Sequence, residues 1–478
     1  MQCDGKRAFG FKAFRAFVFL MNPEIFREYD IRGIAERDLD SETAELIGKA
    51  YGTIIHNKGG KNVVVGRDNR KSGPRILKYF LKGLLSTGTN VIFIGEIPTP
   101  LLYYSVYKLD ADGGVSITAS HNPPEFNGFK AMVGKDAIYG DAIQEIRKIA
   151  ESGKFATAQN GKSGKMKKKK MDAQYLAEIK SMVKIGRKLN IVIDSGNGMA
   201  SELAPKLLRG MSKKLTCLYC KKIPSYPNHL PDPTEEKNIL DLRKKVLSQK
   251  ADMGIAFDGD ADRIGVLDEK GNQIYGDKLL GLYAADLLKR QRGAKIIFEV
   301  KCSQGLSEWI ELKGGKPMMW KTGHSLIKAK MKEEKAALAG EMSGHMFFTE
   351  KWYGFDDAIL AAAKIIEIVS NSGKSVGELA AQMPEYASSP EYRVDFADSE
   401  KFAFIEKARK YFGEKYSVID VDGVRVIFEN GWALLRASNT QPKLILRFEG
   451  KTDADLGQIK ERFLSEIASF SGIKMDLG

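Results

Sequence analysis

Short apolar runs alternate with amphipathic stretches along most of this chain. In its first part, residues 62–65, 91–94 and 115–117 have the length and composition of buried strands. The stretches 72–85 and 100–108 between them are predicted to be helices. Strands that alternate with helices in this way indicate a mixed or largely parallel sheet with helices on its faces.

The same alternation returns twice further along the chain. Residues 190–194 and 253–257 read as strands of a second unit, and residues 295–300 as a strand of a third. A strand-to-helix junction is expected at 320–325 in this third unit. The pattern therefore predicts three successive α/β units, although no strong internal repeat is visible in the sequence.

The pattern changes after residue 385, where several strands follow one another closely. Short connections between strands favour antiparallel pairing, here with helices on one face, as in an α+β domain. The expected elements are a helix at 399–411, strands at 417–420, 424–428, 433–436 and 444–448, and a closing helix at 453–470.

A chain of 478 residues is too long for one ordinary hydrophobic core. The fold class is therefore predicted to be α/β, with several domains. The expected boundaries are an N-terminal extension at 1–20, α/β domains at 21–169, 170–272 and 273–384, and an α+β domain at 385–478.

Composition narrows the range of partners. The chain is 43% hydrophobic and 28% charged, which is typical of a soluble globular protein, and it has no apolar run of the roughly 20 residues that span a bilayer. The net charge of +14 favours anionic partners, either nucleic acid or phosphorylated metabolites. The densest basic run, at 161–170, is interpreted as a solvated connector between domains in preference to a nucleic-acid patch.

Cysteine usage and the N-terminus indicate the compartment. The four cysteines are scattered, and the Cys217–Cys220 pair is interpreted as buried or half-buried thiols. No disulfide framework is expected, which favours a reducing, cytoplasmic location. The apolar stretch 9–20 is interrupted by Lys12 and Arg15, so a secretory signal is not predicted.

Two loops carry the first candidates for chemistry. Ser120 lies at the tip of a small-residue turn after the strand at 115–117, with His121 beside it. An ordinary turn explains this stretch equally well. The loop at 258–263 places three Asp side chains within five residues after another apolar strand, which favours a hard divalent cation over a solvated acidic turn.

Further polar loops follow apolar strands later in the chain. The loop at 436–442 combines an arginine, hydroxyls and an amide, which suit the oxygens of a phosphate group. Four of the five histidines lie in polar loops: His121, His229, His324 and His345. This grouping favours a functional role for His121, His324 and His345.

Five motifs occur in one order: FREYDIRG at 26–33, TASHNP at 118–123, DGDADR at 258–263, GEMSGH at 340–345 and RASNT at 436–440. Together they resemble the α-D-phosphohexomutase family, most closely its bacterial phosphomannomutase/phosphoglucomutase branch. The resemblance covers nearly the whole chain from about Met21, which makes residues 1–20 an extension upstream of the functional start. It implies four domains, three similar mixed α/β domains and a C-terminal α+β domain, around a central cleft.

By this resemblance, Ser120 carries a phosphoryl group and Mg²⁺ is held by Ser120, Asp258, Asp260 and Asp262. The group passes to a sugar monophosphate and gives a bound hexose 1,6-bisphosphate, which returns its other phosphate to the serine. Lys130, Arg263 and His345 are the implied candidates for acid–base work. The implied substrate-binding residues are Tyr29, Arg32, His121, Lys301, His324, Glu341, Ser343, Arg436, Ser438, Asn439 and Thr440.

The expected substrates are mannose and glucose phosphates together, because Glu341 and Ser343 would read the sugar at O3 and O4, where the two sugars are alike. Met342 stands where the phosphoglucosamine mutase branch usually has Gln. That activity stays an alternative, as do a phosphatase and a binder of anionic ligands or nucleic acid on the same fold. The protein is expected to act on phosphorylated hexoses as a monomer, without nucleic acid or membrane.

Overall fold

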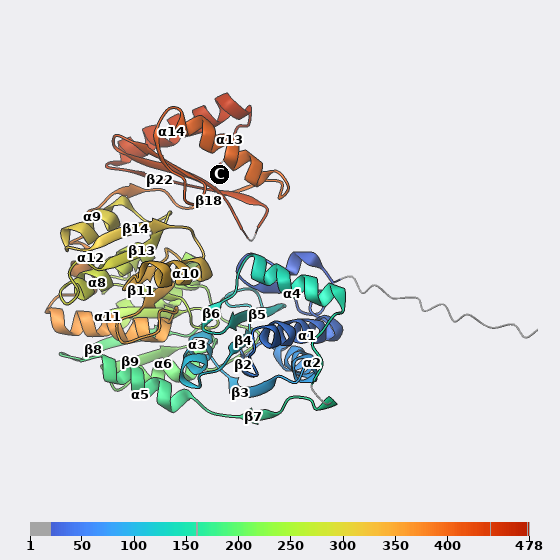
Figure 1. The fold of residues 1–478 in the computed structure, drawn as a ribbon. Helices are drawn as coiled ribbons and strands as arrows, with labels where there is room; N and C mark the ends of the chain where they lie inside the picture. The colour runs from blue at the N-terminus through green and yellow to red at the C-terminus, as the bar shows by residue number, and fades with distance from the viewer. Residues whose placement is uncertain (1–20, 159–160, 440, 476, 478) are drawn as a thin grey trace, which may run out of the picture.

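The computed structural model describes residues 21–158, 161–439, 441–475 and 477, and within them the chain forms four units, each built on one β-sheet (Figure 1). The predicted fold class is confirmed: three mixed α/β units precede an antiparallel C-terminal unit. The extension expected at residues 1–20 lies outside the described part of the chain. None of the described helices has the length and apolar character that crossing a membrane requires.

The first unit is a seven-stranded sheet in the order β1-β5-β4-β2-β3-β7, with β6 on β5. Strands β4, β2, β3 and β7 are parallel, whereas β5 pairs antiparallel with both β1 and β4. Its strands are β1 (Ile31–Ile34), β2 (Asn62–Arg67), β3 (Asn90–Glu96), β4 (Gly113–Ile117), β5 (Phe126–Val133), β6 (Asp136–Ala137) and β7 (Met166–Lys168). Its helices are α1 (Ser41–Asn57), α2 (Gly73–Ser86), α3 (Thr99–Lys108) and α4 (Asp141–Ser152).

The second unit is a five-stranded sheet in the order β12-β11-β10-β8-β9. Strand β8 is parallel to β9 and β10, and a hairpin joins β10 to β11. Its strands are β8 (Leu189–Asp194), β9 (Ser212–Leu218), β10 (Met253–Phe257), β11 (Ile264–Leu267) and β12 (Gln273–Ile274). Its helices are α5 (Asp172–Met182), α6 (Ala200–Leu208) and α7 (Leu240–Gln249).

The third unit is a four-stranded sheet in the order β14-β13-β15-β16, in which β13 is parallel to both neighbours. Its strands are β13 (Lys295–Glu299), β14 (Lys316–Trp320), β15 (Leu338–Gly340) and β16 (Met346–Phe348). Its helices are α8 (Gly276–Leu288), α9 (Gln304–Leu312), α10 (His324–Glu334), α11 (Ala358–Ser372) and α12 (Val376–Ala380).

The fourth unit is a six-stranded antiparallel sheet with α13 and α14 on its outer face (Figure 1). Its order is β17-β22-β21-β20-β19, with β18 also on β22. The elements are β17 (Ala387–Ser388), β18 (Tyr392–Asp395), α13 (Lys401–Gly413), β19 (Ser417–Ile419), β20 (Val424–Phe428), β21 (Gly431–Ala437), β22 (Lys443–Gly450) and α14 (Asp453–Ser471).

Hydrophobic packing ties the first three units together. One continuous core joins α3 of the first unit to the sheets and helices of the second and third, whereas the fourth unit has a core of its own between its sheet and its two helices. Burying apolar surface across unit boundaries fixes the positions of the loops that these units carry. The fourth unit is instead attached to the others through contacts of individual residues, which are described below.

Three details differ from the sequence-based expectations. The basic run is more than a connector, because residues 166–168 form β7 at the edge of the first sheet, with all three side chains exposed. Lysines on an edge strand discourage pairing with other chains. Cys217 is exposed and Cys220 half-buried, so the prediction of buried or half-buried thiols is wrong for Cys217. The strand β5 and the helix α4 were not anticipated from the sequence.

Candidate active site

The candidate residues follow the carboxyl ends of parallel strands in three sheets. Ser120 follows β4, the acidic loop follows β10, and the loops with Lys301, His324 and Glu341 follow β13, β14 and β15. Ligands bind at this end of open α/β sheets. A cleft of about 880 Å³ is lined by four of the predicted residues together with others from the second, third and fourth units. The four are His121, Arg263, Lys301 and Ser343.

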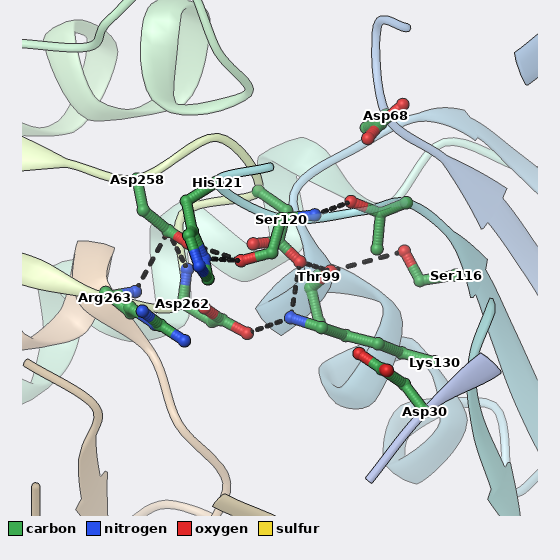
Figure 2. A network of polar contacts seen from close by, with 12 residues as sticks. Asp30, Asp68, Thr99, Ser116, Ser120, His121, Lys130, Asp258, Asp262 and Arg263 are labelled. Carbon is green, nitrogen blue, oxygen red and sulfur yellow. Dashed lines mark hydrogen bonds and ion pairs between the residues drawn. The ribbon is translucent and has the colours of Figure 1, made fainter. Parts of the chain in front are cut away.

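Ser120 points directly at the acidic loop (Figure 2). Its hydroxyl donates a hydrogen bond to Asp258 Oδ2 at 2.7 Å and lies 3.2 Å from Nδ1 of His121. The serine is only 1% exposed and has a left-handed backbone with φ of 52°. Such a conformation costs free energy in a residue with a side chain and is maintained only by its surroundings.

Arg70, which the sequence did not single out, supplies much of that restraint. Its side chain is fully buried, and Nε donates to Asp68 Oδ2 at 3.0 Å. Its two terminal nitrogens donate to four backbone carbonyls of the serine loop, those of Ser120, Asn122, Pro123 and Phe126. A planar guanidinium with five N–H groups matches this set of acceptors, and a lysine would not.

The acidic loop presents three fully buried carboxylates to the serine. Oxygen atoms of Asp258, Asp260 and Asp262 lie within 4.8 Å of one another. Oδ1 of Asp260 and Oδ1 of Asp262 are buried without a hydrogen-bond partner. Buried acceptors that lack partners are costly, and a set of carboxylate oxygens is what a hard divalent cation requires. The donor set therefore fits Mg²⁺.

Burial and neighbouring charges shift the pKa values of the carboxylates in the acidic loop. Burial and the neighbouring Asp262 and Asp260 raise the pKa of Asp258 well above its ordinary value. Lys130 lies between the other two carboxylates, with Nζ 2.7 Å from Asp260 Oδ2 and in contact with Asp262 Oδ2. Burial alone would raise the pKa of Asp260 and lower that of Lys130, but their mutual attraction reverses both directions.

A second cluster of buried groups adjoins the acidic loop. Nε of Arg263 donates to Nε2 of His345 at 3.0 Å. Nδ1 of the same ring lies 2.9 Å from Asp356 Oδ2, which suits a proton on Nδ1 since Nε2 accepts. His324 stacks on His345 at 5.3 Å between ring centroids, and Lys328 donates to Asp356 Oδ1 at 2.9 Å. Burial, with the nearby Lys328, lowers the pKa of His324 well below its usual value.

Glu341 and Ser343 form one hydrogen-bonded pair in the third unit. The hydroxyl of Ser343 donates to Glu341 Oε2 at 3.0 Å, and the backbone N–H of Gly323 donates to Glu341 Oε1 at 2.7 Å. Lys301 lies nearby, with Nζ 3.0 Å from Glu391 Oε2. Burial opposes the charge on Lys301, but Glu299 and Glu391 raise its pKa overall.

The predicted phosphate loop of the fourth unit reaches the first unit. Asn439 donates to the hydroxyl of Tyr29, whose own proton is donated to the carbonyl of Thr322 at 2.7 Å. Nε of Arg436 donates to Asp422 Oδ2 at 3.0 Å. Thr440, also predicted for this loop, lies outside the described residues.

The remaining candidates lie beside the serine. Arg32 pairs with Asp30 and donates to Asn122 Oδ1 at 2.6 Å. Partial burial and the positive charges of Arg263 and Arg32 lower the pKa of His121 well below its usual value. The described candidates from all four units therefore converge on one region. His229 is different, because its Nε2 contacts Asp194 at 3.1 Å and holds a strand end.

Sequence reasoning missed the residues that hold the candidates in place, chiefly Arg70, Glu299, Asp356 and Asp422. Of these, only Asp356 has a visible signal in the sequence, because it is one of two adjacent aspartates before the apolar run of α11. The other three stand in ordinary strand or loop contexts. Asp422, for example, is 14 residues away in the chain from its partner Arg436. Such contacts exist only in the folded chain.

Comparison with known families agrees with this arrangement. Four models of "Phosphoglucomutase/phosphomannomutase" match in order. They are the alpha/beta/alpha domain I at residues 23–157, domain II at 173–271, domain III at 275–386 and the C-terminal domain at 391–466.

Individual relatives match over almost their entire lengths. A phosphomannomutase/phosphoglucomutase of Pseudomonas putida is 44% identical over 445 residues, 93% of this chain and 95% of the relative. A phosphoglucomutase of Neisseria gonorrhoeae is 42% identical over 449 residues, 93% of this chain and 97% of the relative. The crystal structure of a Burkholderia thailandensis phosphoglucomutase/phosphomannomutase family protein superposes with a TM-score of 0.90 at 38% identity, covering 96% of this chain and all of that one.

Proposed function

Because this chain belongs to the phosphoglucomutase/phosphomannomutase family, we propose that it interconverts hexose 1-phosphates and hexose 6-phosphates through a phosphorylated Ser120. Mannose and glucose phosphates are both substrates, and a hexose 1,6-bisphosphate is the bound intermediate and activator. The observation that carries the proposal is the 2.7 Å hydrogen bond from the Ser120 hydroxyl to Asp258, inside a buried cluster of three carboxylates. The relatives named for these two activities support the choice of substrates.

In the first half of the reaction, the bond between phosphorus and Ser120 Oγ breaks as a bond to a sugar hydroxyl oxygen forms, and Ser120 Oγ takes up a proton from an acid, for which Lys130 is a candidate. The proton of that hydroxyl passes to a base, and His345 can take this role once its Nε2 is released from the hydrogen bond that Arg263 donates. Lys130 and Arg263 place positive charge beside the transferred group. The second half repeats the step in reverse with the other phosphate of the bisphosphate.

The residues of the third and fourth units hold the part of the substrate that does not react. Glu341 accepts and Ser343 donates or accepts, which suits two adjacent sugar hydroxyls. Arg436, Ser438, Asn439 and Thr440 are the proposed contacts of the phosphate that stays bound, and Tyr29, Lys301 and His324 are assigned to the reacting end. Arg32 and His121 lie at the reacting end. A guanidinium binds two phosphate oxygens at once, which orients the sugar as well as retaining it.

The three Asp residues with Ser120 would hold Mg²⁺. When bound, this cation neutralises negative charge on the transferred phosphoryl group. The two carboxylate oxygens that lack partners support this assignment, as does the oxygen-only donor set.

The decisive experiment is a coupled assay on glucose 1-phosphate and mannose 1-phosphate with Mg²⁺ and a trace of glucose 1,6-bisphosphate. Wild-type protein is expected to isomerise both sugars, and Ser120→Ala to lose at least ~1,000-fold in kcat because the nucleophile is gone. Ser105→Ala is the matched control, since Ser105 is equally buried but bonds only to a carbonyl within α3.

Other outcomes of this assay would support a different function. Activity confined to glucosamine phosphates would keep the phosphoserine mechanism and refute the choice of sugars. Release of free phosphate in place of isomerisation would identify a phosphatase. Retention of activity in Ser120→Ala would refute the proposed mechanism itself.

A further inference from the structure

One buried carboxylate touches all three substrate-facing loops of the third unit. Glu299 is the last residue of β13, and its side chain is completely buried. Since β13 lies between β14 and β15 in the sheet, a side chain at its carboxyl end stands between the loops that follow both neighbours. No sequence motif marks this position.

The contacts of Glu299 reach each loop separately. Oε2 accepts from the backbone N–H of Lys301 at 3.0 Å and from the hydroxyl of Thr322 at 2.8 Å. Oε1 accepts from the backbone N–H of Met342 at 3.2 Å and lies 3.6 Å from Nζ of Lys301. One carboxylate therefore holds the loop after its own strand, the loop after β14 and the loop after β15.

Those loops carry much of the proposed recognition of the substrate. Lys301 belongs to the first, His324 lies two residues beyond Thr322 in the second, and Met342 stands between Glu341 and Ser343 in the third. The second loop also donates from the Gly323 N–H to Glu341 at 2.7 Å. A movement of any one loop would therefore alter the positions of the others.

Thr322 extends the connection to the other units. Its backbone N–H donates to Asp422 Oδ2 at 3.0 Å, and the same carboxylate oxygen accepts from Arg436. Its carbonyl accepts from Tyr29 of the first unit at 2.7 Å. The three polar groups of Thr322 thus contact residues of three different units, and the hydroxyl ties this junction to Glu299.

We propose that Glu299 is a positioning residue for substrate recognition, whose carboxylate holds the three loops of the third unit in the arrangement that binds the sugar phosphate. This inference rests on the proposed function. Glu299 does not itself need to touch the substrate, because it acts through the backbone of Lys301 and Met342 and through Thr322. Removal from water raises the pKa of Glu299, and the charge of Lys301 and the hydrogen bonds to the carboxylate oppose that rise.

Glu299→Gln tests the proposal with almost no change in shape. The amide has one acceptor oxygen, so its NH₂ group must face either the N–H of Met342 or the donors from Lys301 and Thr322. At least one loop is then released. The expected result is a rise of about tenfold or more in KM for both sugar phosphates with a smaller change in kcat, because positioning of the bound sugar is lost while Ser120 is untouched.

Asp268→Asn is the matched control. Asp268 is also buried and accepts from the backbone of Lys270 and Asn272, but in the turn between β11 and β12. It is expected to lower the melting temperature without raising KM. Loss of stability alone lowers the active fraction and hence the apparent kcat, so a KM for Glu299→Gln equal to that of the wild type would overturn the proposal.

A second pair of variants keeps the proposal testable should Glu299→Gln fail to fold. Thr322→Val removes the hydroxyl that donates to Glu299, and Thr322→Ser retains it. We expect KM to rise in the valine variant and to be restored in the serine variant; equal KM values in both would refute the role of the carboxylate. Absence of isomerisation by the wild-type protein would instead refute the proposed function, so the two failures are distinguishable.

Discussion

At the scale of single residues, the site depends on how closely two loops approach. The Ser120 loop and the acidic loop come from different sheets, and Gly259 lies where they meet. A Cβ atom at this position would lie 2.3 Å from the carbonyl oxygen of Ser120 and 3.2 Å from Pro231 Cγ. The absence of a side chain is therefore what allows the hydroxyl of Ser120 to reach Asp258.

Gly259→Ala is expected to separate the serine from the carboxylates. Because the obstructing atom belongs to the backbone, it cannot rotate away, and a displacement of about 1 Å in a reacting group can cost about 100-fold in rate. We expect kcat to fall by that order in the coupled assay. Gly457→Ala, in α14 with no atom within 4 Å of the added carbon, should leave kcat unchanged. Normal kcat in Gly259→Ala would show that the loops adapt.

At the scale of elements, two adjacent aspartates at the start of α11 have different roles, one beside the candidate site and one in the helix cap. Asp356 faces His345, and the adjacent Asp357 caps the helix by accepting from the N–H of Leu360 at 2.9 Å. Asp357 also accepts from the hydroxyl of Tyr175 in α5, at 2.8 and 2.9 Å. Burial is the main reason that its pKa rises from 3.8 to about 7.

This shift predicts how stability depends on pH. The folded state keeps a proton on Asp357 that the unfolded state releases near pH 4, so the stabilising contribution is complete below pH 4 and is lost as pH rises to about 7. Asp357→Asn mimics the protonated form and retains an N-cap acceptor. At about 1.4 kcal/mol per pKa unit, its free energy of unfolding relative to wild type should rise by roughly 2–3 kcal/mol between pH 5 and pH 7.5.

Urea unfolding at the two pH values measures this difference. Asp40→Asn makes the same chemical change at the N-cap of α1, where Asp40 accepts from the N–H of Thr43 and is partly exposed. It measures what the same change of an N-cap aspartate does where the side chain is partly exposed. A parallel pH dependence in wild type and Asp357→Asn would contradict the assignment.

At the scale of the whole molecule, the fourth unit depends on a few buried polar contacts. Arg425 of β20 is fully buried, donates to the carbonyls of Val300 and Cys302 at 2.7 and 2.8 Å, and lies 3.7 Å from the ring centre of Trp432. Burial lowers its pKa to about 10, which leaves it charged at neutral pH. The two carbonyls belong to the strand end that carries Lys301.

Arg425→Ala should therefore loosen the fourth unit and impair binding together. Leaving two buried carbonyls unpaired and removing the stacked guanidinium is expected to cost about 3 kcal/mol, and KM for sugar phosphates should rise because the phosphate loop is carried by this unit. Thermal unfolding and the coupled assay give the two values. The variant would contradict this view if it melted like the wild type.

The control for this prediction is an exposed contact between units. Lys332 of α10 pairs with Asp136 of β6 at 2.8 Å, with both side chains more than 60% exposed. Exposed ion pairs contribute about 0–1 kcal/mol, so Lys332→Ala should change neither the melting temperature nor KM appreciably.

Much of the fold was predictable because its signals are local. The strand predicted at 115–117 is the last part of β4, and the helix predicted at 453–470 is α14 to within a residue. Each buried apolar run reports its own environment, and the five ordered motifs pointed to the family that the comparisons then confirmed. The strand β7 was missed because a run of lysines gives no apolar signal, and only pairing with β3 makes it a strand.

The sequence by itself determined the chemical inventory: a serine at a strand end, three alternating aspartates, and polar loops in a family order. Which groups meet was decided by the tertiary structure. Ser120 and Asp258 are 138 residues apart, and Glu299 gathers three loops that no local pattern connects. The physical reason is that a residue's type limits what it can bind, whereas its partners, its burial and therefore its pKa are set by segments distant in the chain.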